Sequence, residues 1–126
     1  MPTTEMSETA LPAAIAENDI VFLDFWAAWC SPCRTFAPVF ERASEANPDI
    51  VFGKIDTETE RGLAAAFQIR SIPTLMVFRS GILVFSQPGA LAAPQLDELI
   101  DAVRALDMDA VRAEIARATE AAEVVR

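Results

Sequence analysis

The stretch from Ile20 to Trp26 (Ile-Val-Phe-Leu-Asp-Phe-Trp) constrains the fold more than any other, because its only charged residue is Asp24. Successive side chains of a strand point to opposite faces of its sheet, and here both faces are apolar. Such a strand has to be covered on both sides, which is typical of a sheet between two layers of helices. We therefore expect Ile20–Trp26 to be a central strand of an α/β domain.

The rest of the chain alternates between helical and strand-like patterns. Strand, long helix and strand in succession imply parallel pairing with a right-handed crossover, and a following hairpin adds antiparallel strands. The expected class is an α/β sandwich with a mixed central sheet flanked by helices. The first expected helix is 9–17, with Ser7 or Thr9 as candidate caps and Thr9 favoured because Pro12 must lie in the first turn. The other expected helices are 30–47, a short one capped by Thr57 or Thr59 and ending near Gln68, and 93–106. The further expected strands are 50–56, 74–79 and 82–85.

The two ends of the chain fall outside this pattern. Residues 1–8 are polar and predict a tail or at most a short edge strand, and the domain proper spans 9–106. Asp107 can cap a C-terminal helical extension, 107–126, whose apolar stripe is rich in alanine and valine. We expect this helix to dock on its own domain or to fray partly, and the chain to be a monomer. A weak dimer or a partner bound through 107–126 is the alternative.

Composition limits the classes of partner. Ten Lys and Arg against nineteen Asp and Glu give a formal charge of −9, which repels phosphate backbones and anionic lipids, so neither nucleic acid nor a membrane is an expected partner. No apolar run approaches the roughly 20 residues that cross a bilayer. The first positive side chain is that of Arg34, so the start of the chain lacks a basic leader. The expected location is the cytoplasm.

Cys30 and Cys33 are the only two cysteines, and two residues separate them. Thiols at this spacing can close a small disulfide ring that opens again by exchange with another disulfide, although a local structural bridge has the same spacing. The chain has no histidine, which excludes Cys-His catalysis and histidine-containing metal sites within one chain. Zinc usually takes four ligands, so only a dimer bridged through two such pairs would bind it. We expect no metal.

Five segments together carry a family resemblance. They are Phe22 to Arg34, Pro38, Lys54-Ile55-Asp56, Ile69-Arg70-Ser71-Ile72-Pro73-Thr74 and Gly89-Ala90-Leu91. In this order and spacing they resemble the thioredoxin family over about residues 20–106, which implies the thioredoxin fold. Ser31 departs from the glycine usual in the family's Trp-Cys-Gly-Pro-Cys motif. Because the residues between the cysteines set the redox potential in this family, Ser31 and Pro32 are expected to tune it.

The cysteines can be assigned different roles. Only a thiolate attacks a disulfide, and Cys30 at the start of a helix lies where unpaired amides and the helix dipole favour negative charge. We expect Cys30 to be the nucleophile and Cys33 to resolve the mixed disulfide. Asp24 is the candidate proton acceptor for Cys33, because burial should raise the pKa of this carboxyl; a structural carboxylate is the alternative. Lys54 falls where the family keeps a lysine near the buried aspartate and would tune its basicity, unless it is a plain surface lysine.

The resemblance also implies a substrate-binding surface. Pro73 would follow a cis peptide bond and face the cysteines, which leaves the Ile72 backbone free to pair with a bound peptide as an added strand. Trp29, Ile72 and Pro73, with Gly89 and Ala90, would form a mostly apolar collar that accepts varied partners.

The activity implied is the reduction of protein disulfides, a role in electron transport and cell redox homeostasis. The chain would carry no bound cofactor other than its redox-active disulfide, and electrons would come from NADPH through a separate thioredoxin reductase. Two alternatives stay open: an oxidase or isomerase of higher potential, and a non-catalytic binding or holdase module that works through the acidic tail helix.

Overall fold

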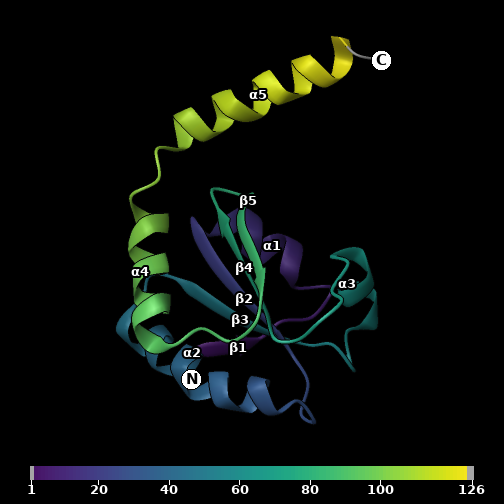
Figure 1. Ribbon diagram of the computed structural model, residues 1–126, viewed down its shortest axis with the longest axis vertical. Coiled ribbons are helices and arrows are strands. Elements are labelled where there is room, and N and C mark those ends of the chain that lie inside the picture. Colours follow the sequence, from purple (N-terminus) through teal and green to yellow (C-terminus); the bar gives the residue numbers. More distant parts are fainter. Residues whose placement is uncertain (1, 125–126) are drawn as a thin grey trace.

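The computed structural model describes residues 2–124, in which strands and helices alternate as far as the fourth strand and are followed by a fifth strand and two helices (Figure 1). In chain order these are β1 (Thr3–Glu5), α1 (Leu11–Glu17), β2 (Ile20–Trp26), α2 (Ser31–Ala46), β3 (Val51–Asp56), α3 (Arg61–Ala66), β4 (Thr74–Arg79), β5 (Ile82–Pro88), α4 (Ala93–Arg104) and α5 (Met108–Val124).

The five strands form one mixed sheet in the order β1-β3-β2-β4-β5. β1, β3 and β2 run parallel, whereas β4 is antiparallel to both β2 and β5. β2 is therefore central and pairs along both edges, with Asp24 opposite Lys54 on one side and Leu75 on the other. The predictions of a central strand and of a mixed sheet are both confirmed.

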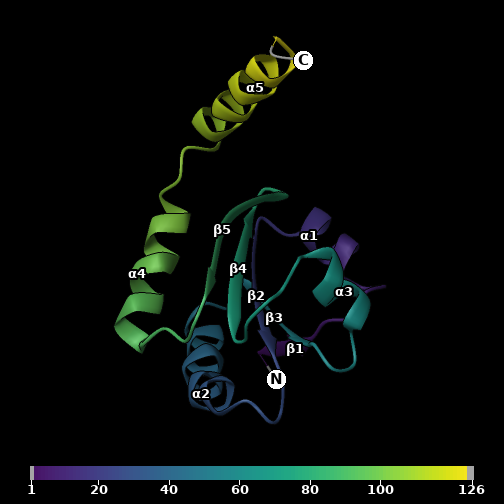
Figure 2. The same cartoon turned by 45° about the vertical axis from the view of Figure 1, so that its right-hand side comes forward.

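Helices cover both faces of this sheet, with α2 and α4 on one side and α1 and α3 on the other (Figures 1 and 2). The alternation of side chains along β2 divides the core accordingly. Phe22 packs with Phe52 of β3 beneath α2 and α4, while Leu23 and Phe25 point to the opposite cluster. The apolar character of both faces of β2 is thus explained by a separate core on each side.

Helix boundaries differ from expectation where side chains have other partners. The N-cap of α1 is Ala10, not Thr9, and the Ser7 hydroxyl accepts the Ala10 N–H at 3.1 Å. Glu60 precedes α3, and Thr57 does not cap it because the Thr57 hydroxyl donates to the Trp26 carbonyl at 3.1 Å. The predictions of Thr9 and of Thr57 or Thr59 as caps are therefore wrong.

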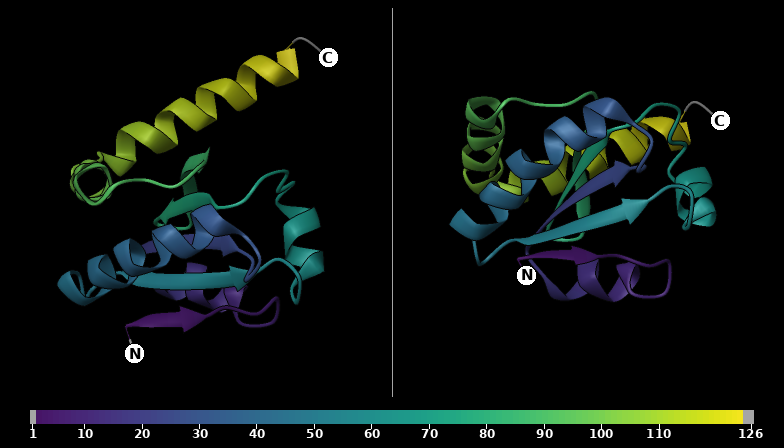
Figure 3. Two further views of the ribbon diagram at one scale, coloured as in Figure 1. Left: turned by 60° about the horizontal axis from the view of Figure 1, so that its bottom comes forward. Right: turned by 90° about the horizontal axis from the view of Figure 1, so that it is seen from below.

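The last helix projects from the domain beyond the β4–β5 hairpin (Figures 1 and 3). Asp107 caps it, accepting the Ala110 N–H at 3.1 Å. Met108 is buried and Val111 half-buried, whereas 45% of Ile115 is exposed, and the side chains from there to residue 123 are exposed. No helix in the described part of the chain is both long and apolar enough to span a bilayer.

This division of the core predicts how two large-to-small substitutions differ. Phe52 is fully buried, with its ring 5.3 Å from that of Phe22 and 5.2 Å from that of Phe40, so Phe52→Ala should lower the free energy of unfolding by about 3–5 kcal/mol. Ile115→Ala on α5 should cost less than about 1 kcal/mol. Urea denaturation of both variants measures this, and equal losses would contradict the assignment of the core to the sheet.

Candidate active site

The two cysteines lie at the first turn of α2, just beyond the end of β2. Cys30 is the N-cap residue, and its sulfur accepts the Cys33 N–H at 3.3 Å. Pro32 occupies the first helical turn, where a missing N–H costs nothing. Cys30 and Cys33 form a disulfide, with their Cα atoms 5.2 Å apart. The same four residues, Cys30 to Cys33, therefore begin the helix and form the disulfide ring.

The two sulfurs are not equally placed. Both cysteines are nearly fully buried, but Cys30 lines a surface cavity of about 430 Å³ and Cys33 does not. Trp29, 68% exposed, stands beside Cys30 on the same cavity. Of the two sulfurs, the one at this cavity is therefore that of Cys30.

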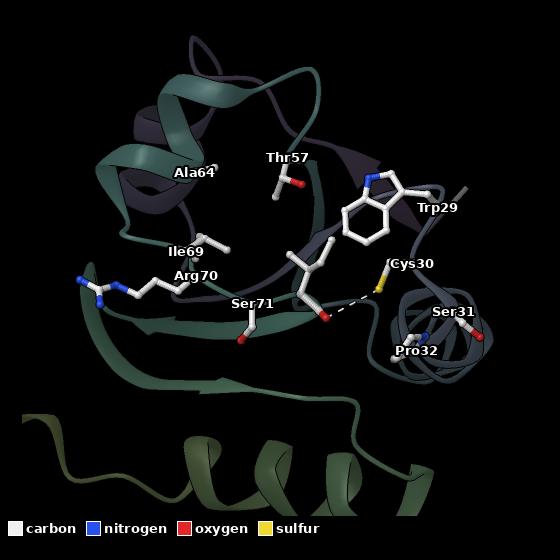
Figure 4. A pocket seen from close by; sticks show the side chains of 10 residues that line it. Trp29, Cys30, Ser31, Pro32, Thr57, Ala64, Ile69, Arg70 and Ser71 are labelled. Carbon is white, nitrogen blue, oxygen red and sulfur yellow. Dashed lines mark hydrogen bonds between the residues drawn. The ribbon is translucent and has the colours of Figure 1, made fainter.

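A loop from the opposite side of the sheet reaches the cysteines. The Ile72–Pro73 peptide bond is cis, as the family resemblance implied, and the Ile72 carbonyl oxygen lies 3.6 Å from Cys30 Sγ (Figure 4). Pro73 is buried, and its carbonyl accepts the Gly89 N–H at 2.8 Å. Gly89 has a φ of +104°, which only glycine adopts freely. The Gly89 N–H thus holds the loop that carries Ile72 in place through its hydrogen bond to Pro73.

The cavity gathers some of the expected residues and not others. Pro73, Gly89 and Ala90 do not line it: Pro73 is buried, whereas Gly89 and Ala90 are exposed outside this cavity. The expected collar is therefore smaller on this cavity than the resemblance implied. The lining residues are Trp29, Cys30, Ser31, Pro32, Thr57, Ala64, Ile69, Arg70, Ser71 and Ile72.

Sequence reasoning gave no role to half of these residues, those from the β3–α3 loop to Ser71. One signal was available: Thr57 directly follows β3, and the carboxyl ends of the parallel strands β2 and β3 lie at one edge of the sheet. Ligands of α/β sheets bind at that edge. The place of Ile69, Arg70 and Ser71 in the cavity depends on how the chain returns from α3, which no local pattern specifies.

Asp24 lies inside the sheet on the face that α2 covers. Phe22 and Phe52 face the core beneath α2, and by alternation Asp24 and Lys54, two residues further along each strand, face the same way. Asp24 is fully buried, and neither carboxylate oxygen has a hydrogen-bond partner among the described residues. Burial raises the pKa of Asp24 from 3.8 to about 7, although the positive charge of Lys54 partly opposes this.

Lys54 is held near this carboxyl by an aromatic contact. Its Nζ lies 4.6 Å from the centroid of the Trp26 ring, close enough for a cation–π interaction. The structure thus places Lys54 half-buried beside the strand that carries Asp24, rather than in the fully exposed position of a plain surface lysine. In residues 2–124 no three Cys, Asp or Glu side chains converge as a metal site would require.

Known proteins share both the sequence and this architecture. The profile of the Thioredoxin family matches residues 2–104. A thioredoxin-type protein of Streptomyces coelicolor is 51% identical over 114 residues, covering 90% of this chain and 85% of that protein, and thioredoxin C-3 of Corynebacterium nephridii is 41% identical over 98 residues, covering 77% and 68%. The solved structure of a mutant thioredoxin from Halobacterium salinarum superposes with a TM-score of 0.76 at 33% identity, covering 83% of this chain and 92% of that one.

The buried carboxyl predicts a pH-dependent stability. Because the pKa of Asp24 is higher in the folded chain than the ordinary 3.8, ionisation destabilises the fold increasingly as the pH rises from about 4 to about 7. Asp24→Asn should therefore raise the free energy of unfolding of the disulfide form by roughly 2–4 kcal/mol at pH 8, with the gain vanishing near pH 4.

Denaturant titrations at pH 4, 6 and 8 measure this difference. Glu98→Gln, on the exposed face of α4, is the matched control and should show no such trend. A gain from Asp24→Asn that is the same at all three pH values would refute the role assigned to desolvation.

Proposed function

This chain belongs to the thioredoxin family of thiol-disulfide oxidoreductases, and from that premise we propose that it works in the cytoplasm as a reductant of protein disulfides. The observation that carries the proposal is the asymmetry of the pair: Cys30 lines the cavity at the start of α2, and Cys33 lies behind it. The Cys30 sulfur can react with a substrate, and the Cys33 sulfur is then available to attack Cys30.

The proposed reaction begins from the reduced pair. The Cys30 thiolate, which the Cys33 N–H and the N-terminus of α2 stabilise, attacks one sulfur of the substrate disulfide. A bond forms between Cys30 and that sulfur, and the other substrate sulfur leaves as a thiolate. Cys33 then loses its proton and attacks Cys30, which closes the Cys30–Cys33 disulfide and releases the second substrate thiolate. Two electrons pass to the substrate, the Cys33 proton passes to an acceptor, and the two product thiolates take up protons from the surrounding water.

Asp24 is the proposed acceptor of the Cys33 proton. It is buried on the face covered by α2, has no competing hydrogen-bond partner among the described residues, and has a pKa raised by burial to about 7. A base with a pKa near the working pH is the most effective in proton transfer. Lys54, paired with Asp24 in register, keeps the pKa from rising further and is the proposed tuning residue.

The substrate is proposed to lie along the Ile72 loop. Trp29 and Ile72 offer apolar surface on either side of Cys30, and the Ile72 backbone offers peptide groups for an extended chain. The substrate surface is proposed to include Pro73, Gly89 and Ala90 as well. They act through the Ile72 loop, which the hydrogen bond from Gly89 to Pro73 holds in place, rather than through the cavity wall. Ser31 and Pro32, both exposed at the cavity, are the proposed tuners of the redox potential.

The electrons that regenerate the dithiol are proposed to come from NADPH through a separate thioredoxin reductase. The chain then needs no bound cofactor, because the Cys30–Cys33 disulfide accepts the electron pair and the resulting dithiol carries it to the substrate. Its partners are the reductase and proteins with accessible disulfides, which places it in cellular electron transport and redox homeostasis.

The assigned roles predict opposite outcomes for the two cysteine variants. With a thioredoxin reductase, NADPH and a disulfide protein as substrate, Cys30→Ser should abolish NADPH consumption, because no nucleophile remains at the cavity. Cys33→Ser should accumulate mixed disulfides with the substrate, visible as a higher-mass band without reductant. A Cys30→Ser protein that still turns over would end the proposal.

The role of Asp24 predicts a pH-dependent kinetic loss. Asp24→Asn should slow the closing of the Cys30–Cys33 bond at pH 7 by about 100-fold, the usual range for loss of a general base. The loss should shrink toward pH 9, because a thiol with a pKa of about 8.5 then ionises unaided. Stopped-flow Trp fluorescence during substrate reduction follows this step, and a loss that does not change with pH would contradict proton acceptance by Asp24.

A further inference from the structure

The cavity beside Cys30 is almost uncharged, and Arg70 is the exception. Of the ten described residues that line it, Arg70 alone carries a charge, and it is exposed. Within residues 2–124 its guanidinium forms no ion pair or side-chain hydrogen bond, in contrast to Arg79 and Arg104, which both pair with aspartates. A free cationic side chain at the rim of a substrate cavity is unusual in a chain with a net charge of −9.

The backbone that carries Arg70 is held at both ends. The Ile69 N–H donates to the Ala64 carbonyl at 2.9 Å, which ties the segment to α3. On the other side the Thr74 hydroxyl donates to the Ser71 carbonyl at 2.6 Å. The backbone position of Arg70 is therefore fixed relative to the cavity, while its exposed guanidinium can bind a ligand.

Arg70 is close in the chain to Ile72, the residue on the cavity wall that lies against the sulfur of Cys30. Ile72, whose carbonyl oxygen is 3.6 Å from Cys30 Sγ, is two residues further along the chain. Ser71 and Ile72 lie in a bend, so the Cα atoms of Arg70 and Ile72 are at most about 7 Å apart, which is the span of two extended residues. A peptide that lies along this wall with its cysteine at Cys30 would bring its second or third neighbour to Arg70. Figure 4 shows the Arg70 side chain at the end of the cavity away from Trp29 and Cys30.

The chemistry of this end favours a carboxylate. A guanidinium binds a carboxylate through two parallel hydrogen bonds, which a neutral or cationic side chain cannot form. Among the described residues, neither Glu58 nor Glu60 of the β3–α3 loop forms an ion pair with Arg70, and Glu60 already accepts the Glu8 N–H at 2.8 Å. Negative charges more than about 8 Å from the guanidinium are largely screened at physiological salt.

We propose that Arg70 determines specificity by selecting protein disulfides that have Asp or Glu two or three residues from the attacked cysteine. The inference rests on the proposed reductase function and names the substrate class of that same site. Arg70 takes no part in electron or proton transfer, so it acts on the recognition of the substrate and not on the chemical step.

The test uses matched disulfide peptides that differ in one side chain. Asp, Asn or Lys is placed two or three residues before or after the target cysteine, and kcat/KM is measured for the full chain with thioredoxin reductase and NADPH. An exposed ion pair of this kind gives about a two- to fivefold effect. The Asp peptide should exceed the Lys peptide by at least that factor in one of the positions, and the ratio should fall toward one in 1 M NaCl.

Variants at Arg70 separate its charge from other causes. Arg70→Gln should erase the preference and Arg70→Glu should reverse it. Arg42→Ala is the matched control, because Arg42 is also exposed but lies about 16 Å along α2 from Ser31. The control should keep the wild-type ratio.

The Asn peptide distinguishes this inference from the function on which it rests. If no peptide is reduced by the wild-type chain, the reductase proposal fails. If the Asn peptide is reduced equally by the wild type and by Arg70→Gln, both proteins are folded and active, and the Asp-to-Lys ratio then decides alone. A ratio that stays the same in Arg70→Gln and Arg70→Glu would overturn the role of Arg70.

Discussion

β2 is paired on both edges and covered on both faces, and the position of the active site follows from that burial. Desolvation of a seven-residue strand whose side chains are almost all inaccessible holds the two halves of the core together. Its carboxyl end leads within four residues to Cys30, so the cysteine pair is anchored to a strand that is paired on both edges and buried on both faces. The same burial encloses Asp24, which a less covered strand would leave solvated.

The burial of Asp24 lowers the stability of the fold but raises the pKa of a carboxyl that the proposed reaction uses. A carboxyl without hydrogen-bond partners inside a sheet destabilises the fold once it is ionised, and Lys54 compensates only in part. Elsewhere the strand obeys the rule that buried positions are apolar. An exception of this kind typically marks a functional site. Here its position on the face beneath α2, the helix that carries Cys33, is the one that the proposed proton transfer from Cys33 requires.

The sequence allowed the fold to be predicted wherever a local pattern has one explanation. The apolar run of β2, the crossover through α2 and the β4–β5 hairpin are of this kind, and so is the helix start at Cys30. The Thr57 cap was mispredicted because its hydroxyl bonds to the Trp26 carbonyl, a partner distant in sequence. The contribution of Ile69–Ser71 to the cavity depends likewise on tertiary placement. The cis bond before Pro73 was expected only through the family resemblance, since sequence pattern alone leaves the isomer undetermined.

Affinity and selectivity have different sources in this cavity. Peptide groups at Ile72 and apolar surface at Trp29 are available to any extended chain, so they contribute binding without discriminating between substrates. Discrimination requires a group whose partner varies from one substrate to another, and the charge of Arg70 is the one such feature among the described lining residues. The net charge of −9 weakens non-selective attraction of anionic proteins at long range. The negative net charge together with the positive charge of Arg70 therefore favours recognition of a carboxylate only on a substrate whose disulfide has already reached Cys30.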